Sequence, residues 1–338
     1  MTTASPPKRR LVTGDRPTGP PHLGHYVGTL ANRVRLQSEF DPFVLVADYH
    51  VLTTRPDRRL EVADDIREDV LGNLAAGLDP ERATIYLQSQ VPETAELFLL
   101  LGMLVSVARV RRIPTLKDKL AETHAAEPSY GLLGYPILQA SDILLVRGEV
   151  VPVGRDQASH IELAREIART FNAAFGPVFP EPVAIVPEVG LLPGIDGDRK
   201  MGRSRGNAIN LFDDAATVEA KVMAMYTDPA RIHATDPGRV EGNPVFAYHD
   251  AFNGDVDEVD DLKVRYRAGK VGDVEVKRRL ARALNAFLDP IRERRAALLG
   301  DDPTIVEDVL AAGRRRAQGE ARATLEVVRA AIGIDAFG

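Results

Sequence analysis

The chain has 338 residues, 44% of them hydrophobic and 27% charged, and carries a formal net charge of −6. This length predicts two domains, or one domain with a large appendage, and the charge argues against a protein that coats nucleic acid indiscriminately. Cysteine is absent, which excludes disulfides, thiolate nucleophiles and cysteine zinc sites.

The N-terminal part of the chain alternates strand-like and helical patterns. Residues 1–10 are expected to form a flexible arm, and they lack the apolar core of a secretory signal. Strand-like runs follow at 11–14, 42–53 and 83–91, with helical patterns between them, one of them from about 23 to 39. Apolar strands alternating with helices predict an α/β fold, a Rossmann-like doubly wound parallel sheet, over residues 11–207.

Helical patterns dominate residues 208–338, which predicts a C-terminal α-helical domain. Within it, residues 262–300 hold eleven lysines and arginines against four acids, in a chain of negative net charge. Such a segment is typical either of a face that contacts RNA phosphates or of the solvated face of an amphipathic helix. No segment reaches the ~20 consecutive apolar residues of a membrane span, so we expect a cytoplasmic protein with no membrane partner.

A Pro/Gly-rich turn, DRPTGPPHLGHY, follows the first strand at residues 15–26. Gly19 and Gly24 allow a polyanion to approach the backbone, and the helix N-terminus behind them favours negative charge. His22 and His25 lie on adjacent turns of that helix and can both donate to phosphate oxygens. This pattern predicts a triphosphate site without a Walker lysine, with a purely structural turn as the alternative.

A second motif, DRKMGRSRGNAI, lies at residues 198–209, at the expected domain boundary. It places three cations, Lys200, Arg203 and Arg205, in a loop with Ser204 and glycines. A basic loop at a hinge can close on the β- and γ-phosphates and stabilise the charge that develops as pyrophosphate leaves. Taken alone, the motif also fits a solvated surface loop.

Together the two motifs resemble the paired signatures of the class I aminoacyl-tRNA synthetases. Residues 22–25, HLGH, match the HIGH motif, and residues 200–204, KMGRS, are similar to KMSKS. An arginine replaces the second lysine and a glycine replaces the first serine, which are expected to alter the mobility and rate of the loop. The catalytic residues that the resemblance implies are His22, Gly24, His25, Lys200, Arg203 and Ser204.

Residues 131–172, from GLLGYPILQASDILL to HIELAREIARTFN, resemble the tryptophanyl-tRNA synthetase subfamily. In that family the aspartate matched by Asp142 accepts the indole N–H, whereas spacing alone also fits a helix N-cap. Gln139 stands where many bacterial members have a methionine, and it is expected to change the tolerance for substituted tryptophans. The implied tryptophan-binding residues are Val12, Tyr135, Gln139, Asp142, Val151, Val153 and Gln157.

The same resemblance implies an ATP site, in which residues 154–157, GRDQ, correspond to a GEDQ segment of relatives. Lys117 resembles a lysine that reaches toward the pyrophosphate, although a solvated helix charge is equally consistent with its position. The implied ATP-binding residues are Arg16, Pro17, Thr18, Gly24, His25, Lys117, Gly154, Arg155, Asp156, Leu191, Lys200, Met201, Gly202, Arg203 and Ser204.

The function implied is ATP-dependent activation of L-tryptophan and its transfer to the 3′ end of tRNA(Trp), with residues 208–338 binding the anticodon. The substrate carboxylate itself attacks phosphorus, so the site needs no protein nucleophile. Mg²⁺ is expected to arrive with ATP as substrate, with no structural metal held by the protein. The resemblance also implies a homodimer, for which residues 105–114 are a candidate interface.

Three alternatives remain open at the level of the sequence. A tyrosyl-tRNA synthetase shares the fold and both motifs. A small nucleotidyltransferase shares the HxGH turn, but it is not expected to have the second basic loop and a helical domain. A divergent duplicate that binds tryptophan, tRNA or a protein partner with little charging activity would fit the departures at Gln139, Arg155 and Gly202.

Overall fold

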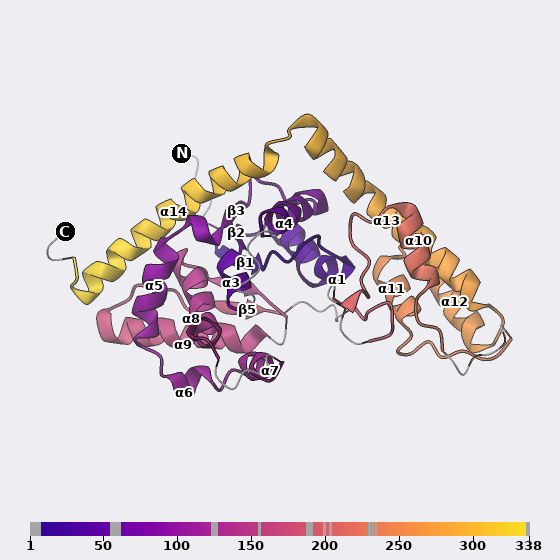
Figure 1. The fold of residues 1–338 in the computed structure, drawn as a ribbon, viewed down its shortest axis with the longest axis horizontal. Coiled ribbons are helices and arrows are strands. Elements are labelled where there is room, and N and C mark those ends of the chain that lie inside the picture. The colour runs from indigo at the N-terminus through magenta and orange to yellow at the C-terminus, as the bar shows by residue number, and fades with distance from the viewer. Residues whose placement is uncertain are drawn as a thin grey trace, which may run out of the picture.

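The computed structural model describes residues 8–54, 62–122, 128–154, 157–186, 192–198, 201–202, 205–228, 231, 233 and 235–335. Its first part is built on a parallel sheet of five strands in the order β3-β2-β1-β4-β5. The strands are β1 (Arg10–Asp15), β2 (Asp41–Val46), β3 (Thr84–Leu87), β4 (Val150–Pro152) and β5 (Val183–Ile185). The expected Rossmann-like parallel sheet with helices is confirmed (Figure 1).

The sheet is buried on both faces, and the buried positions of its central strands β1 and β2 are mainly apolar. Along β2, Phe43 and Leu45 face one core cluster, whereas Val44 and Val46 face another. β1 pairs with β2 from Arg10 to Asp15, and with β4 on its other side. The strand order therefore reverses between β1 and β4, and in open α/β sheets ligands bind beyond the carboxyl ends of the strands at that point.

The helices are distributed around this sheet and continue into a second, all-helical region. In the sheet region they are α1 (Leu23–His25), α2 (Ala31–Leu36), α3 (Asp48–Leu52), α4 (Val62–Ala76), α5 (Glu93–Gly102), α6 (Val107–Val110), α7 (Pro114–Glu122), α8 (Tyr130–Leu145) and α9 (Ala158–Phe175). Beyond it they are α10 (Ala215–Met223), α11 (Pro244–Phe252), α12 (Val256–Arg267), α13 (Asp273–Asp301) and α14 (Ile305–Ile332). No helix among the described residues is long and apolar enough to cross a membrane.

The expected helix from about 23 to 39 has three parts. A π-helical segment, η1 (Tyr26–Leu30), separates α1 from α2, and the helical run ends at Leu36. π-Helical turns are rare and are found frequently at functional sites. Here the segment follows His25 directly, so the irregular turn lies beside the first motif.

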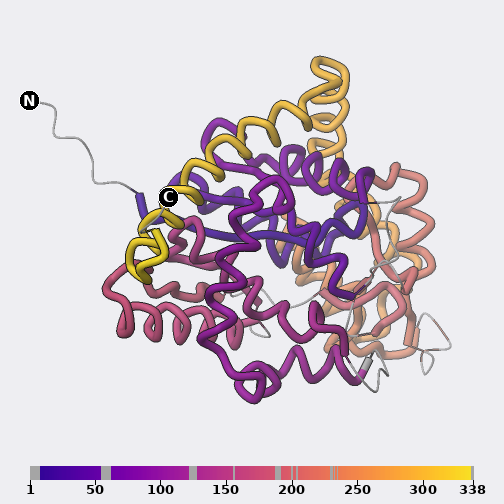
Figure 2. The backbone as a smooth tube through the Cα atoms, turned by 60° about the vertical axis from the view of Figure 1, so that its left-hand side comes forward, coloured from indigo at the N-terminus to yellow at the C-terminus, as the bar shows by residue number. Residues whose placement is uncertain are grey.

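The last helix, α14, lies along the sheet, although the sequence-based division places it in the helical domain. Gly313 of α14 lies so close to β3 that a Cβ on it would be 1.7 Å from the carbonyl oxygen of Ile85. Ala317 and Ala321 continue this small-residue face into the core cluster of the sheet. Figures 1 and 2 both show α14 over the N-terminal half of the chain, away from α11 and α12. The division at residue 208 stays a prediction, and the chain returns to the sheet after α13.

Candidate active site

The first motif forms a tight turn in which its two histidines cap each other. His22 is the N-cap of α1, and the backbone N–H of His25 donates to its Nδ1 at 3.3 Å. In return the backbone N–H of His22 donates to Nδ1 of His25 at 3.4 Å. The two rings stack, with centroids 3.9 Å apart and 17° between their planes. The spacing of three residues thus fixes both imidazoles before any ligand binds.

This capping arrangement also selects a tautomer for each neutral imidazole. Because Nδ1 of His22 and Nδ1 of His25 each accept a backbone hydrogen bond, each neutral ring carries its proton on Nε2. The Nε2–H group is the hydrogen-bond donor of each neutral ring. The turn therefore fixes the orientation of both rings through their Nδ1 atoms.

The second motif packs on the first through backbone pairing and one methionine. Residues 209–211 run beside the histidine turn: Leu23 N–H donates to the Ile209 carbonyl at 2.9 Å, and Leu211 N–H donates to the Pro21 carbonyl at 2.9 Å. A Cβ on Gly24 would lie 3.1 Å from Sδ of Met201 and 2.9 Å from Cε1 of His22. Gly24 is therefore required by packing, and its contact with ATP stays a prediction.

A buried asparagine braces the described end of the second loop. Asn207 is 2% exposed; its Oδ1 accepts the Gly202 N–H at 2.9 Å, and its amide donates to both carboxylate oxygens of Asp196 at 3.0 Å. Arg205 pairs with Asp198. The remaining predicted loop residues, Lys200, Arg203 and Ser204, lie outside the described residues.

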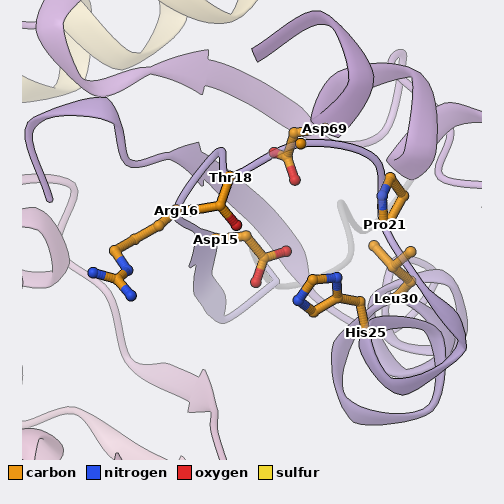
Figure 3. Close-up of a pocket in the computed structure, with 8 residues that line it drawn as sticks. Asp15, Arg16, Thr18, Pro21, His25, Leu30 and Asp69 are labelled. Carbon is orange, nitrogen blue, oxygen red and sulfur yellow. The ribbon is translucent and has the colours of Figure 1, made fainter. Parts of the chain in front are cut away.

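A cavity of about 160 Å³ opens beside the histidine turn at the carboxyl end of β1 (Figure 3). The structure brings the predicted Arg16, Thr18 and His25 together around it. The ring of His25 points toward Asp15, whereas the guanidinium of Arg16 points away (Figure 3). The cavity is lined by Asp15, Arg16, Thr18, Gly19, Pro21, His25, Leu30 and Asp69. Pro17 is buried in the same turn.

Two acidic residues in this lining, Asp15 and Asp69, were not singled out by the sequence. Arg33 of α2 donates from Nη1 to Oδ2 of Asp15 at 2.6 Å. Burial opposes the charge of Asp15, but Arg33 and His25 together hold its pKa below the ordinary value. Burial and the neighbouring charge of Asp15 raise the pKa of Asp69 to about 8, against the opposing effect of Arg33. At neutral pH Asp15 is therefore ionised and Asp69 is mainly protonated.

Asp69→Asn is expected to weaken the pH dependence of stability. A carboxyl group with a raised pKa holds its proton more tightly in the folded chain, so unfolding becomes easier as the pH rises from about 4 to about 8. Asparagine cannot ionise, so the variant should lose less stability than the wild type between pH 5 and pH 8, by roughly 3 kcal/mol. Urea unfolding at both pH values measures this difference. Asp64→Asn, an exposed acid on the same helix, is the control, and equal pH dependence in wild type and Asp69→Asn would contradict the assignment.

Asp142 lies in a second polar cluster, buried near the ends of β2 and β3. Gln88 donates to both of its carboxylate oxygens, at 2.8 and 2.9 Å, and Nε2 of His50 lies 2.9 Å from Oδ2. Burial raises the pKa of Asp142, whereas the hydrogen bonds from His50 and Gln88 lower it. The alternative interpretation as an N-cap is wrong, because Ser129 caps α8 and Asp142 lies in its later part. Neither His50 nor Gln88 was predicted.

The other predicted tryptophan-binding residues differ in their surroundings. Val12 and Val151 are buried in the core cluster of the sheet, and Val153 packs against it. Tyr135 is buried in α8, with its hydroxyl 3.3 Å from Oγ1 of Thr115. Gln139 is partly exposed on the same helix. Their grouping around one amino-acid side chain stays a prediction.

The remaining predicted ATP contacts are spread more widely. Gly154 is exposed and its carbonyl accepts the Gln157 N–H at 3.0 Å, at the start of α9. Lys117 is exposed on α7. Arg155, Asp156 and Leu191 lie outside the described residues. Among the part of the chain that is described, no three His, Asp or Glu residues gather so as to hold a metal ion.

The basic segment at residues 262–300 forms α13 and the end of α12, and most of its cations have partners within the chain. Glu258 accepts from Arg279 and Arg282, each at 2.8 Å. Lys277 is buried and donates to the Met225 carbonyl at 2.6 Å. Further partners bind cations at 263, 265, 267, 292, 294 and 295. The face is therefore less positive than the composition indicates, and RNA binding by it stays a prediction.

Comparison with known proteins agrees with this geometry. The family model for class I tRNA synthetases (W and Y) matches residues 6–289. The chain therefore belongs to the class I aminoacyl-tRNA synthetases of this family. It is 55% identical over 329 residues to the tryptophan--tRNA ligase of Treponema pallidum (strain Nichols), covering 97% of each chain. The expected resemblance to the tryptophanyl subfamily is confirmed.

Solved structures give the same result. The tryptophanyl-tRNA synthetase of Campylobacter jejuni complexed with ADP and tryptophan superposes with a TM-score of 0.84 and 32% identity, over 96% of this chain and 99% of that chain. The tyrosyl-tRNA synthetase of Archaeoglobus fulgidus complexed with L-tyrosine gives a TM-score of 0.66 and 26% identity, over 85% of this chain and 90% of that chain. The comparison favours the tryptophanyl over the tyrosyl interpretation.

Proposed function

We propose that this chain activates L-tryptophan with ATP and transfers it to the 3′ end of tRNA(Trp), the reaction of a tryptophan--tRNA ligase. The observation that carries the proposal is the packing of the second motif on the histidine turn, at the point where the order of the parallel strands reverses. The family relationship supports the same reaction.

The first step is nucleophilic attack by the tryptophan carboxylate on the α-phosphorus of ATP. A new oxygen–phosphorus bond forms, the bond to the β-phosphate bridge breaks, and pyrophosphate leaves with its magnesium ion. The Nε2–H groups of His22 and His25 donate to the phosphate oxygens on which negative charge develops. In the second step a hydroxyl group of the terminal adenosine of the tRNA attacks the carbonyl carbon and forms an ester bond. The bond from that carbon to the phosphate oxygen breaks, and AMP leaves as the hydroxyl proton is released.

The cations of the second loop complete the charge stabilisation. Lys200, Arg203 and Ser204 are proposed to bind the β- and γ-phosphates, and Met201 packs close to Gly24. The Arg203 guanidinium offers a planar fork where a lysine would offer a point charge. Asn207 accepts the N–H of Gly202 at 2.9 Å, which ties Gly202 to the chain that follows the loop.

The tryptophan side chain is bound near Asp142. Oδ1 of this carboxylate accepts from Gln88 at 2.8 Å, and a carboxylate oxygen has a second lone pair that can accept the indole N–H. The apolar wall is formed by Val12, Tyr135, Val151 and Val153, with Gln139 at the edge and Gln157 toward the ammonium and carboxylate groups. ATP contacts are completed by Arg16, Pro17, Thr18, Lys117, Gly154, Arg155, Asp156 and Leu191.

Amino-acid-dependent ATP–pyrophosphate exchange across the standard amino acids tests the function. Exchange with tryptophan alone is the expected result, and charging of tRNA(Trp) would then test the second step. Exchange with tyrosine would overturn the proposed specificity. The absence of exchange with every amino acid would favour a binding paralogue. The substrates ATP and tRNA are consistent with a cytoplasmic location.

A homodimer is proposed for the chain, and an apolar surface on α5, α6 and α8 supports it. Met103 and Tyr130 are 71% and 72% exposed, and Leu99 and Val107 are also exposed. The Phe98 and Tyr130 rings lie 6.5 Å apart, which joins α5 to α8. Large exposed apolar side chains that gather in one region mark protein interfaces.

Met103→Glu should therefore shift the protein from dimer to monomer, because it buries a charge in the proposed interface. Analytical ultracentrifugation at micromolar concentration measures the change. Val264→Glu, an exposed apolar side chain on α12, is the matched control and should leave the dimer intact. A wild-type monomer, or a dimer unaffected by Met103→Glu, would contradict this surface as the interface.

A further inference from the structure

Arg33 is a charged side chain that is joined to the cavity beside the histidine turn through Asp15. It lies on α2 and is 1% exposed, one of the most buried side chains of its size in the described chain. Its guanidinium donates to Asp15 at 2.6 Å and to Oδ1 of Asn73 at 2.9 Å from Nη1, and to Oγ1 of Thr13 at 3.3 Å from Nε and 3.1 Å from Nη2. All three guanidinium nitrogens are therefore engaged.

Stability alone does not account for this group. Desolvating a buried ion pair costs about as much as the pair returns, and apolar replacements of similar volume are often neutral or stabilising. The partner of Arg33 is informative: Asp15 lines the cavity, at the last residue of β1, and the ring of His25 points toward it (Figure 3). The guanidinium thus acts on the side of the cavity that faces His25, the proposed hydrogen-bond donor to the phosphates.

The charges around the cavity explain what Arg33 contributes. The lining includes two carboxyl groups, Asp15 and Asp69, together with His25 and Arg16, and Arg33 pairs with Asp15. An unpaired carboxylate at Asp15 would repel a triphosphate at this site. Arg33 compensates that charge, and its hydrogen bond fixes the direction of the Asp15 carboxylate.

We propose that Arg33 is a positioning residue of the ATP site. Its guanidinium compensates the negative charge of Asp15 and fixes the orientation of that carboxylate, so that His25 can donate to the triphosphate of ATP without an uncompensated carboxylate beside it. The inference rests on the proposed function, because it takes the cavity as the ATP phosphate site. Arg33 itself contacts neither the substrate nor the reacting atoms.

The test compares Arg33→Met with Arg33→Lys and with the double variant Arg33→Met/Asp15→Asn. ATP affinity is measured by calorimetry without amino acid. Tryptophan affinity is measured separately, by the change in fluorescence of the tryptophan ligand or by calorimetry. Arg33→Met should weaken ATP binding by about tenfold, because Asp15 is left uncompensated, while tryptophan binding stays unchanged. Arg33→Lys should fall between Arg33→Met and the wild type. The double variant should recover ATP binding, because both charges are removed.

A purely structural role would give a different pattern. It would lower the midpoint of thermal unfolding and weaken ATP and tryptophan binding in parallel, without recovery in the double variant. That result, or ATP binding by Arg33→Met equal to wild type, would overturn the proposal. If Arg33→Met does not fold, Arg33→Lys and the double variant decide it, because both keep the charge balance near Asp15. Exchange by the wild type tests the proposed function separately, since calorimetry with ATP does not depend on tryptophan activation.

Discussion

Replacing Asp142 by asparagine should raise the KM for tryptophan by about two orders of magnitude and change the KM for ATP little. In the structure this carboxylate already accepts from Gln88, and Nε2 of His50 lies 2.9 Å from it. An asparagine keeps the size but replaces one acceptor oxygen with an N–H₂ donor, which would face other donors in a buried site. Both the indole N–H and the protein donors would then compete for one oxygen.

The assignment of the indole N–H to Asp142 can be separated from a general loss of structure. The probe is a tryptophan analogue in which sulfur replaces the indole nitrogen, so that the ring keeps its shape but loses its donor. Wild type should discriminate strongly against this analogue in ATP–pyrophosphate exchange, and Asp142→Asn should discriminate much less. A change confined to the nitrogen-containing substrate would locate the effect at that hydrogen bond.

Asp48→Asn provides the matched control for this experiment. Asp48 lies at the start of α3, close enough for its charge to raise the pKa of Asp142, but its Oδ1 accepts from the Ser89 backbone N–H at 3.0 Å. Its replacement should affect the preference for the indole donor far less. Equal loss of discrimination in both variants, or none in Asp142→Asn, would remove Asp142 from the proposed role.

The sheet was predictable because its signal is local. Near-continuous apolar runs such as residues 42–46 indicate strands covered on both faces, and the helices between them require parallel pairing. The surroundings of Asp142 were less accessible. His50 and Gln88 follow the ends of β2 and β3, and neighbouring parallel strands end at the same edge of a sheet. The predicted sheet therefore already indicated that His50 and Gln88 lie near each other.

Other features depend on contacts between distant segments. Arg33 occupies a helical pattern in which a charged side chain ordinarily faces solvent, and nothing nearby in the sequence indicates that Thr13, Asp15 and Asn73 enclose it. The basic segment shows the same limitation, since Glu258 and Glu68, which pair with its arginines, lie outside it.

The return of α14 to the sheet left a partial signal. Gly313, Ala317 and Ala321 recur every four residues and give one face of the helix small side chains, which permits close approach to another backbone. The pattern indicates a packing face but does not identify its partner. Only the structure shows that β3 lies beneath it, and that a region expected to belong to the helical domain supports the sheet.

His25→Ala should lower the rate of adenylate formation by about 10²–10³ with a smaller change in tryptophan binding, the effect of removing one preoriented donor to a developing negative charge. The alanine also removes the acceptor of the His22 N–H and the partner of the stacked His22 ring, so the second imidazole loses part of its support. Single-turnover formation of tryptophanyl-adenylate at saturating substrates measures the chemical step directly.

His25→Asn separates these two contributions, because its amide oxygen can accept the His22 N–H while its N–H₂ group remains a donor. We expect it to recover most of the rate that alanine loses. If asparagine is as slow as alanine while both proteins keep wild-type unfolding midpoints, the imidazole ring itself is required, and its stacking on His22 at 3.9 Å becomes the relevant contact. If alanine keeps the wild-type rate, the donor role of the turn is wrong. The capping interaction would then be structural, and the phosphate charge would have to be met by the second loop alone.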